Sequence, residues 1–373
     1  MTAPSTPTGV RVLISGGATG GHLMPGLAIA DALRRRGYAP HEIHFLGAER
    51  GIDTDVVPAA GFGLTVLPGR GIERRFTVAN LANIASIVRG VVGGVVVVGR
   101  MQPDVVVVLG GYASVPGLVG ALVHRVPLIG SEQNAVPSLA IRLTHRFARA
   151  TAVPTEQGLR REVVTGNPVR KEVAALAGAD PAPHRTALGF PPGRRVVVVF
   201  GGSLGSLRIN EAVLGVVTAW SDRDDVAVHH VVGHRDWPSI SVRRPDLSGR
   251  GIWYRQLPYD EDLPTALAAA DLVVCRAGAS TVAELTTIGR PAILIPGPWA
   301  PNDAQAANAS LLAEAGAALV IPDHELDADS LGHHLATMLT DGRLAERAAA
   351  AAALGRPEAA EAVAVLVEEH RRG

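Results

Sequence analysis

The sequence predicts an α/β protein built from two doubly wound domains. Short β-branched runs alternate along the chain with longer Ala- and Leu-rich stretches of helical spacing. Nearly continuous apolar strands separated by helices are typical of parallel sheets that helices cover on both faces. The pattern restarts after residues 178–193 (GADPAPHRTALGFPPG), a stretch rich in proline and glycine. A chain of 373 residues is long enough for two such domains, each with its own core.

The apolar runs give nine expected strands, five before the interruption and four after it. They lie at residues 10–14, 43–46, 64–67, 105–109, 128–130, 196–200, 226–232, 272–275 and 292–295. We therefore place an N-terminal Rossmann-like domain at residues 1–168 and a C-terminal one at 169–356, with a hinge near Gly166-Asn167-Pro168. Residues 357–370 have helical spacing and are expected to pack back onto the first domain.

Composition excludes several classes of chemistry. Lys plus Arg and Asp plus Glu both number 35, so no overall basic field is available to hold nucleic acid. Cys275 is the only cysteine, which excludes an internal disulfide framework and a cysteine-based zinc cluster. Lys171 is the only lysine, and the P-loop signature G-x-x-x-x-G-K-[ST] is absent.

The sequence shows neither a secretory signal nor a membrane span. The first nine residues are polar and lead directly into a strand-like run, without the charged and apolar regions of a signal peptide. The most apolar stretch, residues 91–99, is far shorter than the roughly 20 residues that a spanning helix needs. A cytoplasmic location is therefore expected.

Three expected strands end in glycine pairs, at Gly16-Gly17, Gly110-Gly111 and Gly201-Gly202. Glycine accepts positive φ and lets ligand atoms approach the main chain. Each pair precedes a helix, whose N-terminus favours anions. One such pair is as often a simple tight turn as a ligand site. Three of them at strand ends in both halves predict a cleft between the domains that binds phosphate or another anion.

His22 follows the first glycine loop and is a candidate general base, because its ordinary pKa lies near neutrality. The alternative is a histidine that only makes structural hydrogen bonds. Pro25 is expected in the first turn of the next helix. A nicotinamide site is poorly supported, because the spacing of GGATGG departs from G-x-G-x-x-G and only Glu49 is available as a ribose acid.

The segment CRAGASTVAELTTIGRPAILIP, which starts at Cys275, is expected to form a strand, a turn of small residues and a helix. Ser280 or Thr281 is the expected helix cap. Glu284 then has two interpretations that spacing leaves open. It either closes a capping box on the main chain, or it accepts hydrogen bonds from ribose hydroxyls while the helix N-terminus holds a diphosphate.

Other acidic and histidine clusters are given no catalytic role. Asp-x-Asp occurs four times, and its carboxylates are expected as caps at helix starts and turns rather than as a metal site. The four pairs are at residues 53–55, 222–224, 260–262 and 327–329. No role is assigned to the histidines at 229, 230, 234, 333 and 334.

Seven motifs stand in order over essentially the whole chain: GGATGGH, LGGYASVPG, SEQNAVPS, TGNPVR, FGGSLGS, CRAGASTVAE and NDAQAANA. Together they resemble the MurG family of N-acetylglucosaminyltransferases, which make lipid II and belong to the GT-B class. The resemblance implies two Rossmann-like domains facing across a cleft, with the acceptor and the membrane on the first and the donor on the second. It implies inverting transfer of N-acetylglucosamine from UDP-N-acetylglucosamine (UDP-GlcNAc) to the MurNAc 4-hydroxyl of undecaprenyl-diphospho-MurNAc-pentapeptide (lipid I).

The resemblance also implies roles for single residues. His22 is the implied base, and Glu132 is the second catalytic candidate. Gly110, Gly111 and Tyr112 are implied to lie near the acceptor diphosphate. The implied donor contacts are Thr19, Gly20, Gly21, Asn134, Arg170, Ser203, Asp260, Ala279, Ser280, Thr281, Val282, Ala283, Glu284 and Gln305. No tightly bound cofactor and no metal are implied.

Three positions depart from the family pattern. Ser131 stands where histidine is common before EQN, and Ala304 stands where a polar residue precedes Gln305. Asp260 stands where an apolar residue usually borders the uracil, although a main-chain contact there would survive the change. These contacts are therefore less secure than the phosphate and ribose contacts.

The implied partners are lipid I, other cell-wall synthesis proteins and the inner face of an anionic membrane. An apolar patch rimmed by arginine fits the membrane, and its alternative is a core face with solvated arginines. The patch comprises Arg70, Ile72, Arg74, Arg75, Phe76, Leu81, Ile84, Ile87 and Arg89. Two other functions stay open: another UDP-sugar enzyme of this class, such as a UDP-GlcNAc 2-epimerase, and a nucleotide-sugar sensor that binds without turnover.

Overall fold

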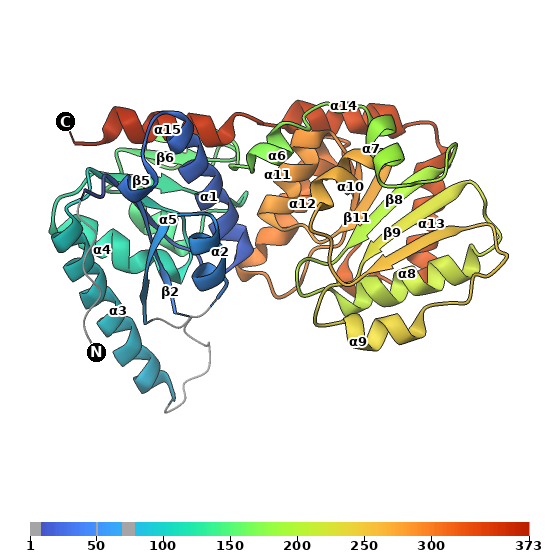
Figure 1. The fold of residues 1–373 in the computed structure, drawn as a ribbon, viewed down its shortest axis with the longest axis horizontal. Coiled ribbons are helices and arrows are strands. Elements are labelled where there is room, and N and C mark those ends of the chain that lie inside the picture. The colour runs from blue at the N-terminus through green and yellow to red at the C-terminus, as the bar shows by residue number, and fades with distance from the viewer. Residues whose placement is uncertain (1–8, 50, 69–78, 373) are drawn as a thin grey trace. The chain divides into compact units, whose positions relative to one another are not determined.

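The computed structural model describes residues 9–49, 51–68 and 79–372. The chain divides into two compact units, the first comprising Met1–Lys171 and Arg356–Gly373 and the second comprising Glu172–Gly355. The boundary thus lies three residues after the one placed at 168/169. Each unit contains a sheet with helices around it (Figure 1).

Unit 1 contains a parallel sheet of seven strands in the order β3-β2-β1-β4-β5-β6-β7. The five strands expected here are confirmed, whereas β6 and β7 were not expected. β6 is a short ATAV run, and β7 is a three-residue edge strand with exposed valines. The strands are β1 (Val12–Ser15), β2 (Ile43–Ala48), β3 (Gly63–Leu67), β4 (Val105–Val108), β5 (Leu128–Ser131), β6 (Ala150–Val153) and β7 (Glu162–Val164).

Both faces of this sheet are covered, as the continuous apolar runs predict. Ile14 of β1 packs into a core on one face of the sheet, while the preceding residue, Leu13, packs into a second core on the other face. Among the described helices, none is both long and apolar enough to cross a membrane. The helices of unit 1 are α1 (Gly20–Arg35), α2 (Asp53–Ala59), α3 (Ala79–Met101), α4 (Val115–Val123), α5 (Leu139–Thr144) and α15 (Ala359–His370).

Helix α15 is part of unit 1 although it follows all of unit 2 in sequence. Val363 and Val367 are fully buried in the same core as Ile29 of α1. Arg35 of α1 forms an ion pair with Glu361 of α15 at 2.7 Å. The last helix therefore completes the core of the first unit (Figure 1).

Unit 2 contains a parallel sheet of six strands in the order β10-β9-β8-β11-β12-β13. The four strands expected here are confirmed. The two additional strands lie at the sheet edges, where β10 (WYRQL) has polar residues at two adjacent positions and β13 has only three residues. The strands are β8 (Arg195–Phe200), β9 (Val226–Val231), β10 (Trp253–Leu257), β11 (Leu272–Cys275), β12 (Ala292–Leu294) and β13 (Ala318–Val320).

Helices pack on both sides of this second sheet, and a single cluster joins α8 and α13 to the strands through side chains such as Val213 and Leu335. The helices are α6 (Lys171–Ala174), α7 (Pro181–Ala187), α8 (Leu207–Ala219), α9 (Trp237–Ile240), α10 (Leu263–Ala269), α11 (Ala279–Ile288), α12 (Ala304–Glu314), α13 (Ala328–Thr340) and α14 (Leu344–Leu354).

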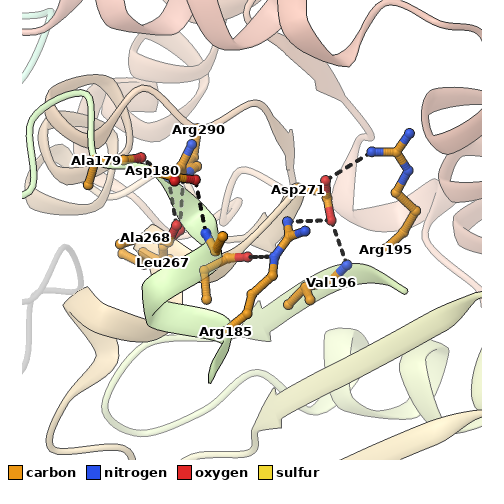
Figure 2. Close-up of polar contacts among 11 residues, drawn as sticks. Ala179, Asp180, Arg185, Arg195, Val196, Leu267, Ala268, Asp271 and Arg290 are labelled. Atoms are coloured by element: carbon orange, nitrogen blue, oxygen red, sulfur yellow. Dashed lines mark hydrogen bonds and ion pairs between the residues drawn. The ribbon is translucent and has the colours of Figure 1, made fainter. Parts of the chain in front are cut away.

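Two arginines fasten the proline- and glycine-rich segment 178–193 to unit 2 (Figure 2). Arg185 of α7 donates through Nε to the Ala269 carbonyl at 2.8 Å and through Nη2 to Asp271 at 2.6 Å. Arg290 donates to the main-chain carbonyls of Ala179 and Ala268 at 2.8 and 2.6 Å. The segment that interrupts the sequence pattern is therefore a folded part of unit 2.

We expect Asp271→Ala to destabilise unit 2 by about 3 kcal/mol, because it leaves the buried N–H of Val196 and the partly buried guanidinium of Arg185 without their acceptor. Asp271 accepts from Arg185, from Arg195 at 3.2 Å and from the main-chain N–H of Val196 at 2.7 Å. Urea unfolding measures the loss. The matched control is Asp222→Ala, whose exposed pair with Arg250 is worth less than about 1 kcal/mol. Equal losses in the two variants would contradict this prediction.

Candidate active site

Each sheet has one point where its strand order reverses. In unit 1, β1 to β3 follow one another toward one edge of the sheet and β4 to β7 toward the other, so the order reverses between β1 and β4. In unit 2 it reverses in the same way between β8 and β11. Ligands of open α/β sheets bind at the carboxyl ends of the strands at such a point. The first two glycine loops follow β1 and β4, and the third follows β8. The topology thus brings the first two predicted loops together in unit 1 and places the third at the corresponding point of unit 2.

The loop after β1 needs its glycines. Gly16 and Gly17 have φ of 134° and 149°, and Ala18 also has positive φ, at 67°. A Cβ atom at Gly16 would lie 2.8 Å from Cβ of Leu109, and one at Gly17 would lie 2.5 Å from Oδ2 of Asp53. Only bare main chain fits between these neighbours.

Asp53, the first residue of an Asp-x-Asp pair, holds this loop in place. Its side chain is 1% exposed, and it accepts from the main-chain N–H of Ala18 at 2.7 Å and of Ala48 at 3.1 Å. Burial raises the pKa of Asp53, against the effect of the two N–H donors. This carboxylate at the start of α2 thus acts as an anchor for two strand ends rather than only as a cap.

Helix α1 begins at Gly20, five residues earlier than Pro25 suggests. Thr19 is the extended residue before the helix, with φ −131° and ψ 154°, so Gly20, Gly21 and His22 form its first turn. The expectation for Pro25 is therefore wrong, because the flexible glycines already adopt helical geometry and the proline lies in the second turn. Since proline has no N–H, the Gly21 carbonyl lacks its usual donor within the helix.

His22 lies against the loop after β4. Its Nδ1 atom is 3.1 Å from Oγ1 of Thr19. Cβ atoms built at Gly110 and Gly111 would lie 3.6 Å and 3.4 Å from the imidazole ring, which is ordinary van der Waals contact, so the ring lies directly beside the bare main chain of this loop. The residue as a whole is half-buried. Burial lowers the pKa of His22, while the negative charge of Glu132 opposes this shift.

The loop after β4 continues into a short 3₁₀ turn, Tyr112–Ser114, and then into α4. Gly110 and Gly111 both have positive φ, at 84° and 69°. Ser114 fixes the turn by donating to the Gly111 carbonyl at 2.8 Å. The side chain of Tyr112 is 40% exposed beside this turn. Of the three residues predicted for the acceptor, Gly110 and Gly111 thus adjoin His22, and Tyr112 follows them in the turn.

Glu132, the second catalytic candidate, organises its own loop. It follows β5, is 1% exposed, and accepts from the main-chain N–H groups of Gln133 and Asn134 at 2.9 Å each and of Ser138 at 2.7 Å. The side chain of Asn134 also donates to it, at 3.2 Å. These bonds hold Asn134 and the start of α5, and they occupy both carboxylate oxygens. Glu132 affects His22 through its charge.

The loop after β8 is open and glycine-rich. Gly202 and Gly205 have φ of 98° and 93°. Ser203 is exposed, and its carbonyl accepts from the main-chain N–H of His234 at 3.3 Å. Ser206 is the residue before α8 and is 3% exposed. The loop thus offers main-chain N–H groups and one exposed hydroxyl to a ligand.

Arg276, which follows β11, is not among the predicted site residues. It is 7% exposed and donates to Oγ of Ser206 at 2.6 Å, to Asp323 at 2.6 Å and to the Ile295 carbonyl at 3.1 Å. Its guanidinium also lies 4.7 Å from the ring centre of Trp299. Arg276 therefore ties together the loops after β8, β12 and β13. The one signal in the sequence is a charged residue in an otherwise small-residue turn.

The helix after β11 starts earlier than expected. Gly278 is the N-cap, in extended conformation, and α11 begins at Ala279. The predicted capping by Ser280 or Thr281 is wrong, because both lie inside the first turn. Glu284 is the sixth residue of the helix and is too far along to close a capping box. Oγ of Ser280 is buried without a hydrogen-bond partner in the described structure. Val282 and Ala283 continue the same turn.

The remaining predicted donor residues lie in both units. Gln305 is in the first turn of α12, and its Oε1 atom accepts from the main-chain N–H of Gly297 at 2.8 Å. Asp260 lies just beyond β10 and bonds to His229. Arg170 belongs to unit 1, as do Thr19, Gly20, Gly21 and Asn134. The predicted donor set is thus divided between the two units.

The other three Asp-x-Asp pairs also have protein partners, and that of Asp222 is Arg250 at 2.7 Å. Asp327 caps α13 by accepting from the N–H of Ser330 at 2.8 Å, and Asp262 accepts from Thr265 at 2.7 Å. Within the described ranges, no group of three His, Cys, Asp or Glu side chains is placed to hold a metal ion. The predicted membrane patch lies mainly outside the described residues, since only the side chains of Ile87 and Arg89 are described.

Comparison with known proteins decides the family. The Glycosyltransferase family 28 N-terminal domain matches residues 12–153, and the Glycosyltransferase family 28 C-terminal domain matches residues 196–363. The curated "UDP-N-acetylglucosamine--N-acetylmuramyl-(pentapeptide) pyrophosphoryl-undecaprenol N-acetylglucosamine transferase" of Desulforudis audaxviator is 35% identical over 96% of this chain and 98% of the relative. The protein of the same name from Alkalilimnicola ehrlichii is 40% identical over 97% and 99%. This chain belongs to the MurG family of glycosyltransferases.

The fold of this glycosyltransferase agrees with a solved structure. The crystal structure of Acinetobacter baumannii MurG has a TM-score of 0.77 to it and 24% sequence identity, covering 96% of this chain and 99% of that chain. The predicted GT-B class, with two Rossmann-like parallel-sheet domains, is confirmed.

Proposed function

We propose that this glycosyltransferase transfers N-acetylglucosamine from UDP-GlcNAc to the MurNAc 4-hydroxyl of lipid I and so makes lipid II. The observation that supports the proposal most directly is the position of His22. It packs against the bare main chain of Gly110 and Gly111, at the point of unit 1 where the strand order reverses. The names of the full-length relatives support the same reaction. In this proposal unit 1 supplies the base and the acceptor loop, and unit 2 binds most of the donor.

The proposed reaction is a single displacement. The acceptor hydroxyl attacks the anomeric carbon from the face opposite UDP, so an α-linked donor gives a β-linked product. His22 takes the hydroxyl proton through Nε2, with Nδ1–H donating to Thr19. The bare loop of Gly110 and Gly111 leaves room for the acceptor diphosphate beside that ring, with Tyr112 at its edge.

The proposed donor site uses main-chain N–H groups. The loop that contains Ser203 and the first turn of α11 bind the diphosphate and stabilise its charge as UDP leaves. Glu284 accepts from the ribose hydroxyls. Gln305, whose Oε1 is held by Gly297, uses its Nε2 to donate to the sugar. Arg170 and Asn134 add donor contacts from unit 1, and the proposal requires no metal ion.

Release of UDP from UDP-GlcNAc tests the function when measured with and without a short-chain lipid I analogue. We expect release only with the acceptor, together with a lipid II analogue as product. A 2-epimerase would instead convert UDP-GlcNAc to its 2-epimer without acceptor, and a sensor would bind UDP-GlcNAc without turnover. Release that ignores the acceptor would refute the proposal.

The pKa of His22 predicts the acid limb of the pH–rate profile. Because burial lowers this pKa, the ring stays neutral, and able to accept a proton, to lower pH than an exposed histidine. We expect kcat/KM to fall on the acid side only below the ordinary histidine value of about 6.5. An acid limb centred above pH 7 would rule out His22 as the group that titrates.

We also propose peripheral attachment to the cytoplasmic face of an anionic membrane. Val88, Val92 and Val96 are 55%, 57% and 42% exposed at four-residue spacing along α3, so they share one face. Val123, at the end of α4, is 58% exposed, and Arg89 is exposed beside Val88. Apolar side chains next to basic ones suit an anionic leaflet. Failure to sediment with anionic vesicles at low salt would refute attachment.

A further inference from the structure

A buried histidine–carboxylate pair joins β9 to the segment just beyond β10. Nε2 of His229, on β9, is 2.7 Å from Oδ2 of Asp260, and the two side chains are 1% and 12% exposed. The other carboxylate oxygen accepts from the main-chain N–H of Asp262 at 3.0 Å. Nδ1 of His229 is buried with no hydrogen-bond partner in the described structure, so Nε2 carries the proton that Asp260 accepts.

This pair adjoins the glycine loop of the proposed donor site. The main-chain N–H groups of Val232 and Gly233 donate to the carbonyls of Leu257 and Pro258 at 2.9 and 3.0 Å, which joins the loops after β9 and β10. The N–H of the next residue, His234, reaches the Ser203 carbonyl at 3.3 Å. The residues at 232–234 are therefore hydrogen-bonded on one side to the segment just before Asp260 and on the other to the loop proposed for the diphosphate.

An exposed aromatic surface lies at the same place. Tyr259, one residue before Asp260, is 47% exposed and stacks on His234, with ring centres 5.0 Å apart and an interplanar angle of 14°. A flat aromatic surface beside a diphosphate loop suits a planar base. The main chain at 259–261 carries both N–H and carbonyl groups, and uracil offers a carbonyl oxygen and an N–H on one edge.

The pair explains how Asp260 is accommodated. A buried carboxylate without partners would be costly, and here burial alone would raise the pKa of Asp260. The hydrogen bond from His229, together with that from the Asp262 N–H, outweighs this effect and holds the pKa of Asp260 below its ordinary value. If His229 alone were lost, the carboxylate would be left buried and unpaired. The loop would then have to move to hydrate it.

We propose that His229 is a positioning residue for the nucleobase of the donor. Through Asp260 it fixes the main chain on which a uracil-type base is read, and so it sets the preference for uridine nucleotides. The inference rests on the proposed function, because it assumes that a UDP-sugar binds to unit 2.

Binding of UDP and CDP to the full chain, measured by calorimetry, tests the proposal. The two ligands share the ribose and the diphosphate and differ only on the edge of the base. We expect His229→Leu to weaken UDP about tenfold and CDP much less, so that the preference for UDP falls about tenfold. His229→Gln keeps a donor for Asp260 and should lose no more than about threefold. The double variant His229→Leu/Asp260→Leu removes both partners and should recover to within about threefold of the native protein.

His324→Gln is the matched control, since this histidine of unit 2 is 80% exposed and should change neither affinity. Equal weakening of UDP and CDP would show a merely structural role and overturn the inference, as would an unchanged UDP affinity in His229→Leu. If His229→Leu does not fold, Asp260→Asn carries the same test at constant size. A native protein that binds no UDP would refute the proposed function itself, whereas native binding with unchanged variants would refute only this inference.

Discussion

His22→Ala is expected to lower kcat by about three orders of magnitude while the Kd for UDP-GlcNAc changes by less than about threefold. Loss of a positioned general base costs 10²- to 10⁴-fold in rate. The donor contacts proposed for unit 2 are untouched by this change, so binding should persist. Steady-state kinetics with a lipid I analogue and calorimetry with UDP-GlcNAc separate the two effects.

Two controls sharpen this result. His41→Ala removes another histidine of unit 1, an exposed one in a short 3₁₀ turn, and should leave kcat unchanged. Thr19→Val removes the hydroxyl that bonds to Nδ1 of His22 while keeping the size of the side chain. It should lower kcat by about tenfold, because the ring loses the partner that fixes its tautomer. Full activity in His22→Ala would remove the histidine from its proposed role.

Glu132→Ala should lower both the stability of unit 1 and kcat. The carboxylate accepts from three main-chain N–H groups, and buried donors left unpaired cost about 1–3 kcal/mol each. We therefore expect a loss of at least about 3 kcal/mol on urea unfolding, together with a kcat reduced about 100-fold because Asn134 and the start of α5 are displaced.

Glu132→Gln distinguishes positioning from proton transfer. Its amide keeps one acceptor oxygen but turns an NH₂ group toward main-chain N–H donors. We therefore expect stability and kcat to fall in this variant too, but by less than in Glu132→Ala. It also removes the negative charge that raises the pKa of His22, and the acid limb of kcat/KM should therefore move to lower pH. If Glu132 itself accepted the proton of the acceptor hydroxyl, the acid limb of kcat/KM would disappear in Glu132→Gln instead of moving to lower pH.

Much of the fold follows from the apolar pattern of the sequence. Central strands such as β4, with the residues VVVV, are buried on both faces and have no other plausible structure. β7, β10 and β13 lie at sheet edges, where burial is partial and three to five residues give little periodicity. β6 is the second strand from the sheet edge and reads ATAV between Ala- and Arg-rich neighbours, so its sequence does not separate it from a helix.

The candidate site was predictable in its glycine loops but not in the side chains that hold them. Positive φ leaves a clear mark in the sequence, because glycine is needed at positions such as Gly17 and Gly110. Asp53, Arg276 and His229 act over long sequence separations, and each finds its partners only after the sheets form. The helix starts at Gly20 and Ala279 were misplaced because glycine and alanine at these positions allow the helix to begin before the residues that usually mark its start.

The contact between α15 and α1 has a consequence for synthesis of the protein. Since Val363 and Val367 belong to the core beneath α1, unit 2 is an insertion within unit 1. On the ribosome, unit 2 can finish folding while the first unit still lacks its last helix. Until α15 has been synthesised, the nascent chain exposes an apolar surface on unit 1, and a chaperone that shields such surfaces would act there.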